Sequence, residues 1–297
     1  MKDYLSINDL SKEELLEILD LSVKLKQEQK DGKDQTAYLK GKSLGLIFEK
    51  PSLRTRISFE VGMKQLGGTV VVLSGSEVQM DGREALSDVS KVLATYLDAV
   101  MVRTFGQELI EQLAEASSIS VINGLTDLEH PCQILADLMT IKEEFGTLDG
   151  LKIAYVGDGN NVSRSLMLAC TKLGIQFQLA CPVGFEPGKE YESEFTTVSH
   201  GVGEAAQDAD VLYTDVWASM GQEEEAVKRR RAFTGYQINT SLLEEFANDK
   251  AIVLHCLPAH RGEEITGKVF DLHEKTIIRQ AENRLHAQKA ILMKLLG

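Results

Sequence analysis

Basic residues, long apolar runs and cysteines are all scarce in this chain of 297 residues. Its 32 lysines and arginines are outnumbered by 45 aspartates and glutamates, and the net charge of −13 disfavours binding to nucleic acid or an anionic membrane through overall charge. No apolar run approaches the about 20 residues that cross a bilayer. The N-terminus leads into acidic residues rather than into the apolar core of a signal peptide. We therefore expect a cytoplasmic protein without membrane or nucleic-acid partners.

The four cysteines, at positions 132, 170, 181 and 256, lack C-x-x-C spacing, so zinc ribbons and disulfide frameworks are not expected. Two catalytic signatures are missing as well. A P-loop ending in Gly41-Lys42-Ser43 would need glycine where Thr36 stands, and no G-x-S-x-G nucleophile elbow occurs. What is present is an ordinary globular balance of 43% hydrophobic and 26% charged residues, over a length suited to about two domains.

Short apolar runs alternate with helical patterns twice along the chain, which predicts an α/β protein with parallel, buried sheets. We predict strands at residues 44–48, 70–73, 99–102 and 120–122, and then at 153–156, 177–180, 211–214 and 252–254. We predict helices near 53–66, 84–96 and 106–117, over 130–145, and over 283–296. The boundary between two domains is placed in or just after the helix at 131–145.

Residues 52–56, S-L-R-T-R, follow the first predicted strand at the start of a helix. Amide N–H groups, two hydroxyls and the guanidiniums of Arg54 and Arg56 favour a phosphate site, because a helix N-terminus and charge-assisted hydrogen bonds both attract anions. Arg103 ends another predicted strand, at the sheet edge where ligands bind in open parallel sheets. The simpler alternatives are a capped helix with solvated arginines, and a salt bridge at the rim for Arg103.

Residues 130–133, H-P-C-Q, open the long helix and place an imidazole where a neutral histidine can donate to a developing oxyanion. A metal is not predicted, since this helix carries no second histidine or carboxylate at ligand spacing. Residues 157–161, G-D-G-N-N, make a poor dinucleotide site, because Val162 replaces the third glycine and no acidic residue follows the next strand. The two asparagines could instead hold the polar end of an amino acid.

Residues 215–221, D-V-W-A-S-M-G, follow a predicted strand, and with the charged stretch up to Arg231 they predict a mobile flap. A solvated helical face is the simpler interpretation of that stretch, since its acidic and basic residues are spaced i,i+4. Residues 255–258, H-C-L-P, place a thiol at the end of another strand, and Arg284 begins the last predicted helix.

Together these motifs resemble the aspartate/ornithine carbamoyltransferase family, and within it the ornithine branch. S-x-R-T-R, H-P-x-Q, D-x-x-x-S-M-G and H-C-L-P occur in order along essentially the whole chain. The resemblance implies two parallel-sheet α/β domains joined by two helices. A carbamoyl phosphate-binding domain would cover residues 1–135 with a returning C-terminal helix at 283–297, and an ornithine-binding domain would cover 136–282. It also implies a homotrimer or a multiple of trimers, and neither a cofactor nor a metal.

The implied reaction transfers the carbamoyl group of carbamoyl phosphate to the δ-amine of L-ornithine, giving L-citrulline and phosphate, in arginine biosynthesis or its reverse in catabolism. The residues that the resemblance makes catalytic are Arg54, Arg103, His130 and Cys256. Those implied to bind carbamoyl phosphate are Ser52, Leu53, Arg54, Thr55, Gln79, Arg103, His130, Pro131, Cys132, Gln133, Cys256, Leu257 and Arg284. Those implied to bind ornithine are Asn161, Asp215, Ser219 and Met220.

Two alternatives stay open. The chain could carbamoylate a related amine such as putrescine or an acylated ornithine, although Asp215 suits a free α-ammonium group. It could also be a non-catalytic, anion-binding oligomeric protein on the same scaffold, although Arg54, Arg103 and Cys256 are all retained.

Overall fold

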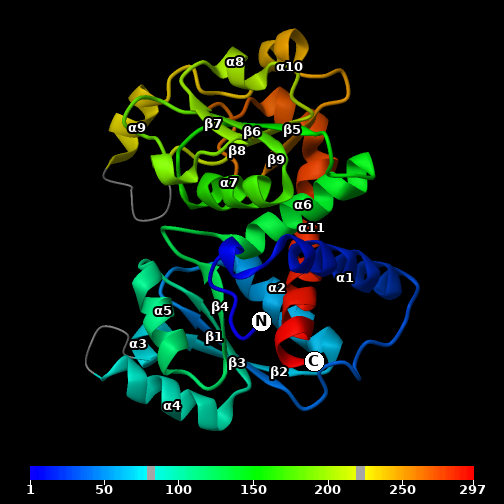
Figure 1. Cartoon of the computed structure of the whole chain (residues 1–297), viewed down its shortest axis with the longest axis vertical. Coiled ribbons are helices and arrows are strands. Elements are labelled where there is room, and N and C mark those ends of the chain that lie inside the picture. Colours follow the sequence, from blue (N-terminus) through cyan, green and yellow to red (C-terminus); the bar gives the residue numbers. More distant parts are fainter. Residues whose placement is uncertain (79–83, 219–224) are drawn as a thin grey trace. The chain divides into compact units, whose positions relative to one another are not determined.

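The computed structural model describes residues 1–78, 84–218 and 225–297 (Figure 1). The chain divides into two compact units. The first unit comprises Met1–Met139 and Asn283–Gly297, and the second comprises Thr140–Glu282. Both divisions fall inside helices, α6 (Pro131–Phe145) and α11 (Gly267–Leu296), so two helices join the units.

The first unit is built on a parallel sheet of strand order β2-β1-β3-β4. Its strands are β1 (Ser43–Phe48), β2 (Thr69–Ser74), β3 (Ala99–Arg103) and β4 (Ser120–Leu125). Its helices, besides its parts of α6 and α11, are η1 (Ile7–Asp9), α1 (Lys12–Lys30), α2 (Leu53–Leu66), α3 (Gly75–Val78), α4 (Leu86–Tyr96) and α5 (Gln107–Ala116). Every residue of β3 is buried, as expected for a strand covered on both faces.

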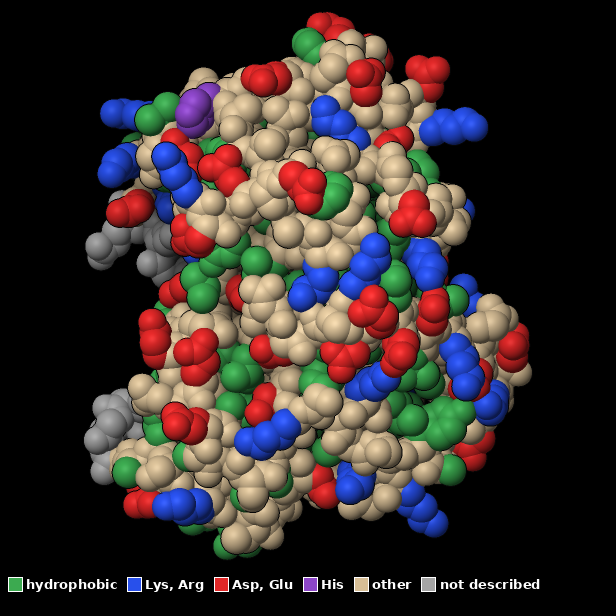
Figure 2. All heavy atoms as spheres, in the orientation of Figure 1, with side chains coloured by type: hydrophobic (Ala, Val, Ile, Leu, Met, Phe, Trp, Pro, Cys, Tyr) green, Lys and Arg blue, Asp and Glu red, His purple; other side chains and the backbone are tan. Residues whose placement is uncertain are grey.

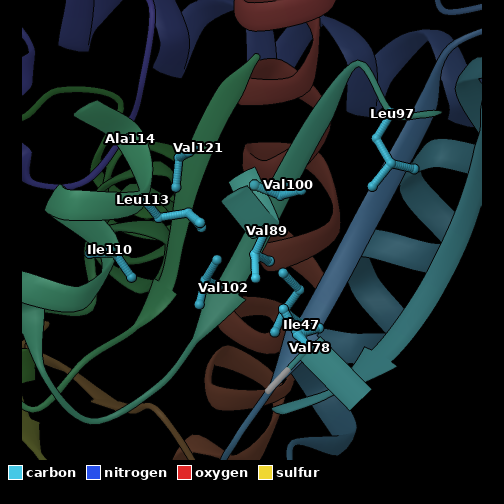
Figure 3. Packing of buried hydrophobic residues seen from close by; sticks show 10 residues of the cluster. All are labelled: Ile47, Val78, Val89, Leu97, Val100, Val102, Ile110, Leu113, Ala114 and Val121. Atoms are coloured by element: carbon cyan, nitrogen blue, oxygen red, sulfur yellow. The ribbon is translucent and has the colours of Figure 1, made fainter. Parts of the chain in front are cut away.

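Apolar side chains of α4 and α5 point toward the sheet and form a core with its strands (Figure 3). The buried members are Ile47, Val78, Val89, Leu97, Val100, Val102, Ile110, Leu113, Ala114 and Val121. Helix α2 packs against the C-terminal part of α11, where Gly62 leaves room for the side chain of Lys289 (Figure 1). This packing brings Arg284, near the end of the chain, into the same unit as residues 52–56.

The second unit is also built on a parallel sheet, which has the strand order β7-β6-β5-β8-β9. Its strands are β5 (Lys152–Val156), β6 (Gln176–Ala180), β7 (Thr196–Ser199), β8 (Val211–Thr214) and β9 (Ile252–His255), all parallel. Its helices, besides its parts of α6 and α11, are α7 (Asn161–Leu173), η2 (Lys189–Tyr191), α8 (Val202–Ala206), α9 (Ala226–Ala232) and α10 (Thr240–Phe246). The predicted fold class, two parallel-sheet α/β units joined by two helices, is confirmed.

Several features differ from the sequence prediction. Helix α11 begins at Gly267 rather than near residue 283. Strand β7 was not predicted, and neither was the pairing of Tyr4 with Ile122 beside β4.

Acidic and basic side chains are interspersed over the face shown in Figure 2. None of the helices in the described ranges combines the length and apolar character needed to cross a bilayer.

Candidate active site

One candidate site lies in the first unit, at the N-terminus of α2. Ser52 is the N-cap, and its hydroxyl accepts a hydrogen bond from the Thr55 N–H at 3.2 Å. Leu53 is 71% exposed, so its backbone N–H, not its side chain, is the group available to an anion. Arg56 differs from expectation, because its Nε donates to Glu60 at 2.8 Å on the exposed helix surface. Of the two arginines in this motif, Arg54 is therefore the candidate for an anion site.

Thr55 joins two arginines that are distant in sequence. Its buried hydroxyl oxygen accepts from Arg103 Nη1 at 3.4 Å and from Arg284 Nη2 at 3.1 Å. Arg284 Nη1 also donates to Gln133 Oε1 at 2.7 Å, and Gln133 Nε2 donates to Asp137 at 2.8 Å. Motif residues from α2, β3, α6 and α11 thus converge in the first unit. Both guanidiniums are nearly buried, so rotation of their side chains is restricted.

Arg54, Arg103 and Arg284 form a cationic region in the first unit, and His130 lies close enough to feel their charges. Burial lowers its pKa well below the ordinary value of 6.5, and the positive charges of Arg284, Arg103 and Arg54 lower it further. The imidazole is therefore neutral at physiological pH. A neutral imidazole keeps an N–H that can donate to a carbonyl oxygen, and the surrounding cations favour negative charge on that oxygen.

The two residues between His130 and Gln133 have structural contacts. The Pro131 carbonyl oxygen accepts from the Tyr4 hydroxyl at 3.3 Å. The Cys132 thiol donates to the Asn123 carbonyl oxygen at 3.3 Å, and burial raises the pKa of Cys132 to about 12. Cys132 is therefore a buried thiol rather than a nucleophile.

A second candidate site lies in the second unit, where β5, β8 and β9 end. Cys256 Sγ donates to Asp215 Oδ1 at 2.8 Å, and Asp215 Oδ2 accepts from Asn160 Nδ2 at 2.9 Å. The Oδ1 atom of Asn160 caps α7 by accepting from the N–H groups of Val162 and Ser163. Asn161 is the first residue of that helix. Tandem asparagines therefore have separate positions, one as helix cap and one in the first turn.

Asp215 is 6% exposed and also accepts from the Val216 N–H at 2.8 Å, so its carboxylate orientation is fixed by three donors. A buried carboxylate of this kind is suited to an ammonium group of a ligand, which would replace part of its present hydrogen bonding.

His255 supports the segment that carries Cys256. Its Nε2 lies 3.0 Å from Glu264 Oε1, and its Nδ1 accepts from the Leu257 N–H at 2.9 Å. His255 and Glu264 are buried, and Leu257 has a positive φ of 61°, an uncommon conformation for a residue with a β-carbon. Sequence reasoning missed Glu264, since a carboxylate in a loop carries no local signal of burial.

Two other sequence predictions concern residues 215–231. Arg229 is buried rather than solvated, because its Nη1 donates to Asp158 at 2.7 Å and to the Trp217 carbonyl oxygen at 3.0 Å. The sequence did not indicate this ion pair, because acidic and basic residues spaced i,i+4, such as those before Arg231, are typical of an exposed helix. Ser219, Met220 and the rest of the expected flap up to residue 224 lie outside the described residues, as does Gln79.

Gly159 shows why a dinucleotide site is not supported at residues 157–161. A β-carbon on Gly159 would lie 2.4 Å from the Phe185 carbonyl oxygen, so the absent side chain makes room for the protein's own backbone. Among the described residues, two groups present three potential metal ligands each: Asp215 with His255 and Cys256, and His260 with Glu263 and Glu264. Both ring nitrogens of His255 are already engaged, and Glu263 accepts from Arg230 at 2.9 Å. We assign no metal to either group.

The family is shown by comparison with known proteins. Residues 2–143 match the carbamoyl-phosphate binding domain of aspartate/ornithine carbamoyltransferases, and residues 149–295 match the aspartate/ornithine binding domain of the same proteins. The chain therefore belongs to the aspartate/ornithine carbamoyltransferase family.

Individual relatives agree with this assignment. The chain is 50% identical over 306 residues to the ornithine carbamoyltransferase of Oceanobacillus iheyensis, covering 100% of this chain and 94% of the relative. Among solved structures, ornithine carbamoyltransferase from Pyrococcus furiosus is similar, with a TM-score of 0.94, 45% identity and coverage of 100% and 97%. The anabolic ornithine carbamoyltransferase of Campylobacter jejuni has a TM-score of 0.91 and 35% identity, with 99% of each chain covered.

Proposed function

We propose that this chain transfers the carbamoyl group of carbamoyl phosphate to the δ-amine of L-ornithine, producing L-citrulline and phosphate. The observation that carries the proposal is a cluster in the first unit, where Arg103 and Arg284 both donate to Thr55 and Arg284 also donates to Gln133. Burial, together with the positive charges of these arginines and Arg54, keeps His130 neutral beside this cluster. The names of its relatives, which are ornithine carbamoyltransferases, indicate ornithine as the acceptor, and the matched carbamoyl-phosphate binding domain indicates the donor.

In the first unit, carbamoyl phosphate would bind through its phosphate at the N-terminus of α2, with Arg54 and the N–H groups that follow Ser52. Its carbonyl oxygen would accept from Thr55, Arg103 and His130. When the amine attacks, this oxygen becomes anionic and the three donors bind it more tightly than in the ground state. Arg54 would stabilise the charge that develops on the leaving phosphate.

In the second unit, the Asp215 carboxylate would hold the α-ammonium group of ornithine, with Asn161 beside it in the first turn of α7. Ser219 and Met220 are proposed to complete this site. Cys256, which donates to Asp215 at 2.8 Å, is proposed to assist loss of the proton from the attacking δ-amine. That amine resembles a lysine side chain, whose pKa is about 10.4, so only a small fraction is nucleophilic at neutral pH.

We also propose that the protein is a homotrimer, or a multiple of trimers. Support comes from exposed apolar side chains in the first unit, which are Leu53, Ile57 and Val61 on α2 and Val71 and Val72 on the edge strand β2. Exposed apolar residues and an open sheet edge favour contact with another copy. A role in arginine biosynthesis is proposed from the relative in Campylobacter jejuni, which is described as anabolic. A cytoplasmic location is proposed from the sequence alone, whose N-terminal residues are charged rather than apolar.

A substrate panel tests the reaction. The purified chain is incubated with carbamoyl phosphate and ornithine, putrescine or N-acetylornithine, and ureido products are quantified. We expect the highest kcat/KM with ornithine, and for Asp215→Asn a KM for ornithine raised about tenfold with little change for carbamoyl phosphate. Asp149→Asn, an exposed substitution in the same unit, is the control. A kcat/KM for putrescine equal to that for ornithine would overturn the substrate assignment.

A further inference from the structure

The N-terminal segment extends the sheet of the first unit beyond β4. The Tyr4 N–H donates to the Val121 carbonyl oxygen at 2.9 Å, and the Tyr4 carbonyl accepts from the Asn123 N–H at 2.8 Å. The Asn123 side chain adds a hydrogen bond from Nδ2 to the Leu5 carbonyl oxygen at 2.8 Å. Residues next to Tyr4 are thereby held along the strand that leads to the H-P-C-Q motif.

Glu129, immediately before His130, forms hydrogen bonds with the N-terminal segment through both carboxylate oxygens. Its Oε1 accepts from the Ser6 hydroxyl at 2.5 Å, and its Oε2 accepts from the Ile7 N–H at 3.2 Å. The Thr126 N–H donates to the Glu129 carbonyl at 2.9 Å, which closes a tight turn. Glu129 is 4% exposed, so both carboxylate bonds are made in a largely water-free environment, where they are strong.

Ser6 is itself rigidly placed. Its hydroxyl oxygen accepts from the Asn8 N–H at 3.0 Å, and its own N–H donates to Asp9 Oδ2 at 2.9 Å, forming a capping box. On the other side of His130, the Pro131 carbonyl is tied to Tyr4 at 3.3 Å. Burial raises the pKa of Tyr4 well above its ordinary value, which keeps this hydroxyl protonated. The same N-terminal segment is therefore hydrogen-bonded to the residue directly before the histidine and to the residue directly after it.

We propose that Ser6 and Glu129 are positioning residues for His130: they hold the turn at residues 126–130 so that the imidazole N–H points at the carbonyl oxygen of carbamoyl phosphate. The inference rests on the proposed function for the identity of that oxygen. Its physical basis is that a donor must keep nearly constant geometry to stabilise a developing charge, and a small displacement reduces the rate steeply.

Kinetics of four single variants provide the first test. Ser6→Ala removes the hydroxyl that Glu129 accepts from, Ser6→Thr retains one, and Asn8→Ala changes an exposed side chain in the same turn. We expect Ser6→Ala to lower kcat by about tenfold, Glu129→Gln to do the same, and Ser6→Thr and Asn8→Ala to stay within about twofold of the wild type. The KM for ornithine should not change.

A double-mutant cycle separates positioning from general destabilisation. If Ser6 acts through His130, Ser6→Ala should have almost no further effect on kcat in a His130→Ala background. Equal fold losses in both backgrounds would overturn the inference, as would a Ser6→Ala enzyme with wild-type kcat. Thermal unfolding of each variant identifies any that fail to fold, in which case Ser6→Thr and Glu129→Gln carry the comparison.

The second test does not depend on turnover. The His130 ring resonance is assigned in a ¹³C–¹H spectrum by its loss in His130→Ala. We expect this resonance to shift or broaden in Ser6→Ala and not in Asn8→Ala, and an unmoved resonance would refute the positioning role. If the wild type forms no citrulline while this resonance responds as expected, the proposed function fails and the positioning of His130 stands.

Discussion

Replacing Thr55 with valine removes the oxygen that Arg103 and Arg284 share while keeping nearly the same side-chain volume. The Arg284 bond at 3.1 Å is well formed, whereas the Arg103 bond at 3.4 Å is long. A hydrogen bond to a charged group contributes about 1.5–3 kcal/mol. Since Arg284 provides most of this, we expect Thr55→Val to lower the free energy of unfolding of the first unit by about 2 kcal/mol.

The variant should also be a poor enzyme, because the guanidiniums lose the acceptor that orients them and the carbonyl oxygen of the substrate loses a donor. We expect a shift in thermal midpoint of about 4–8 °C, at about 2–4 °C per kcal/mol for a unit of this size. The KM for carbamoyl phosphate should rise about tenfold or more.

Calorimetry and citrulline formation measure the two effects on one preparation. Thr69→Val, on the exposed edge strand β2, is the matched control because it loses a hydroxyl at the surface of the same unit. We expect it to leave both the midpoint and the KM almost unchanged. The reasoning is refuted if Thr55→Val shows the midpoint and the KM of Thr69→Val.

Three further predictions concern titratable groups. Cys256→Ser should lower kcat in a citrulline assay while leaving carbamoyl phosphate binding intact; wild-type kcat would exclude a role for the thiol in proton removal. His130 should show no ring titration by NMR between pH 6 and 8, because burial holds its pKa in the folded state well below 6.5. Near pH 6 the unfolded state therefore binds more protons than the folded state, so the free energy of unfolding should fall as the pH drops through 6.5. Burial holds the pKa of Lys289 at about 8, below the ordinary 10.5, so the free energy of unfolding should rise with pH above about 8, and Lys289→Met should abolish that rise.

All the strands except β7 could be predicted, because buried parallel strands are continuous apolar runs, as in β3 and β8, whereas β7 is mostly polar. The convergence at Arg103 followed from the same rule, since β1 and β3 are neighbours and their carboxyl ends share one edge. The first half of α11 escaped prediction because Leu272 and Ile278 are exposed, which blurs the apolar stripe that marks an amphipathic helix. Contacts between distant residues, such as Ser6 with Glu129, have no local pattern at all.

The cationic region also explains how a chain with net charge −13 can attract an anion. Thr55 and Gln133 offer neutral oxygen atoms to Arg103 and Arg284, so these bonds orient the guanidiniums without cancelling their charge. Had Thr55 been an aspartate, the same contacts would have been ion pairs, and an incoming phosphate would have had to compete with a buried carboxylate. Burial lowers the pKa of His130, and the positive charges of Arg284, Arg103 and Arg54 lower it further, so the imidazole stays neutral beside them. Neutral acceptors thus allow the folded protein to keep cations fixed in position before the anion arrives, which is the condition for stabilising charge that develops during the reaction.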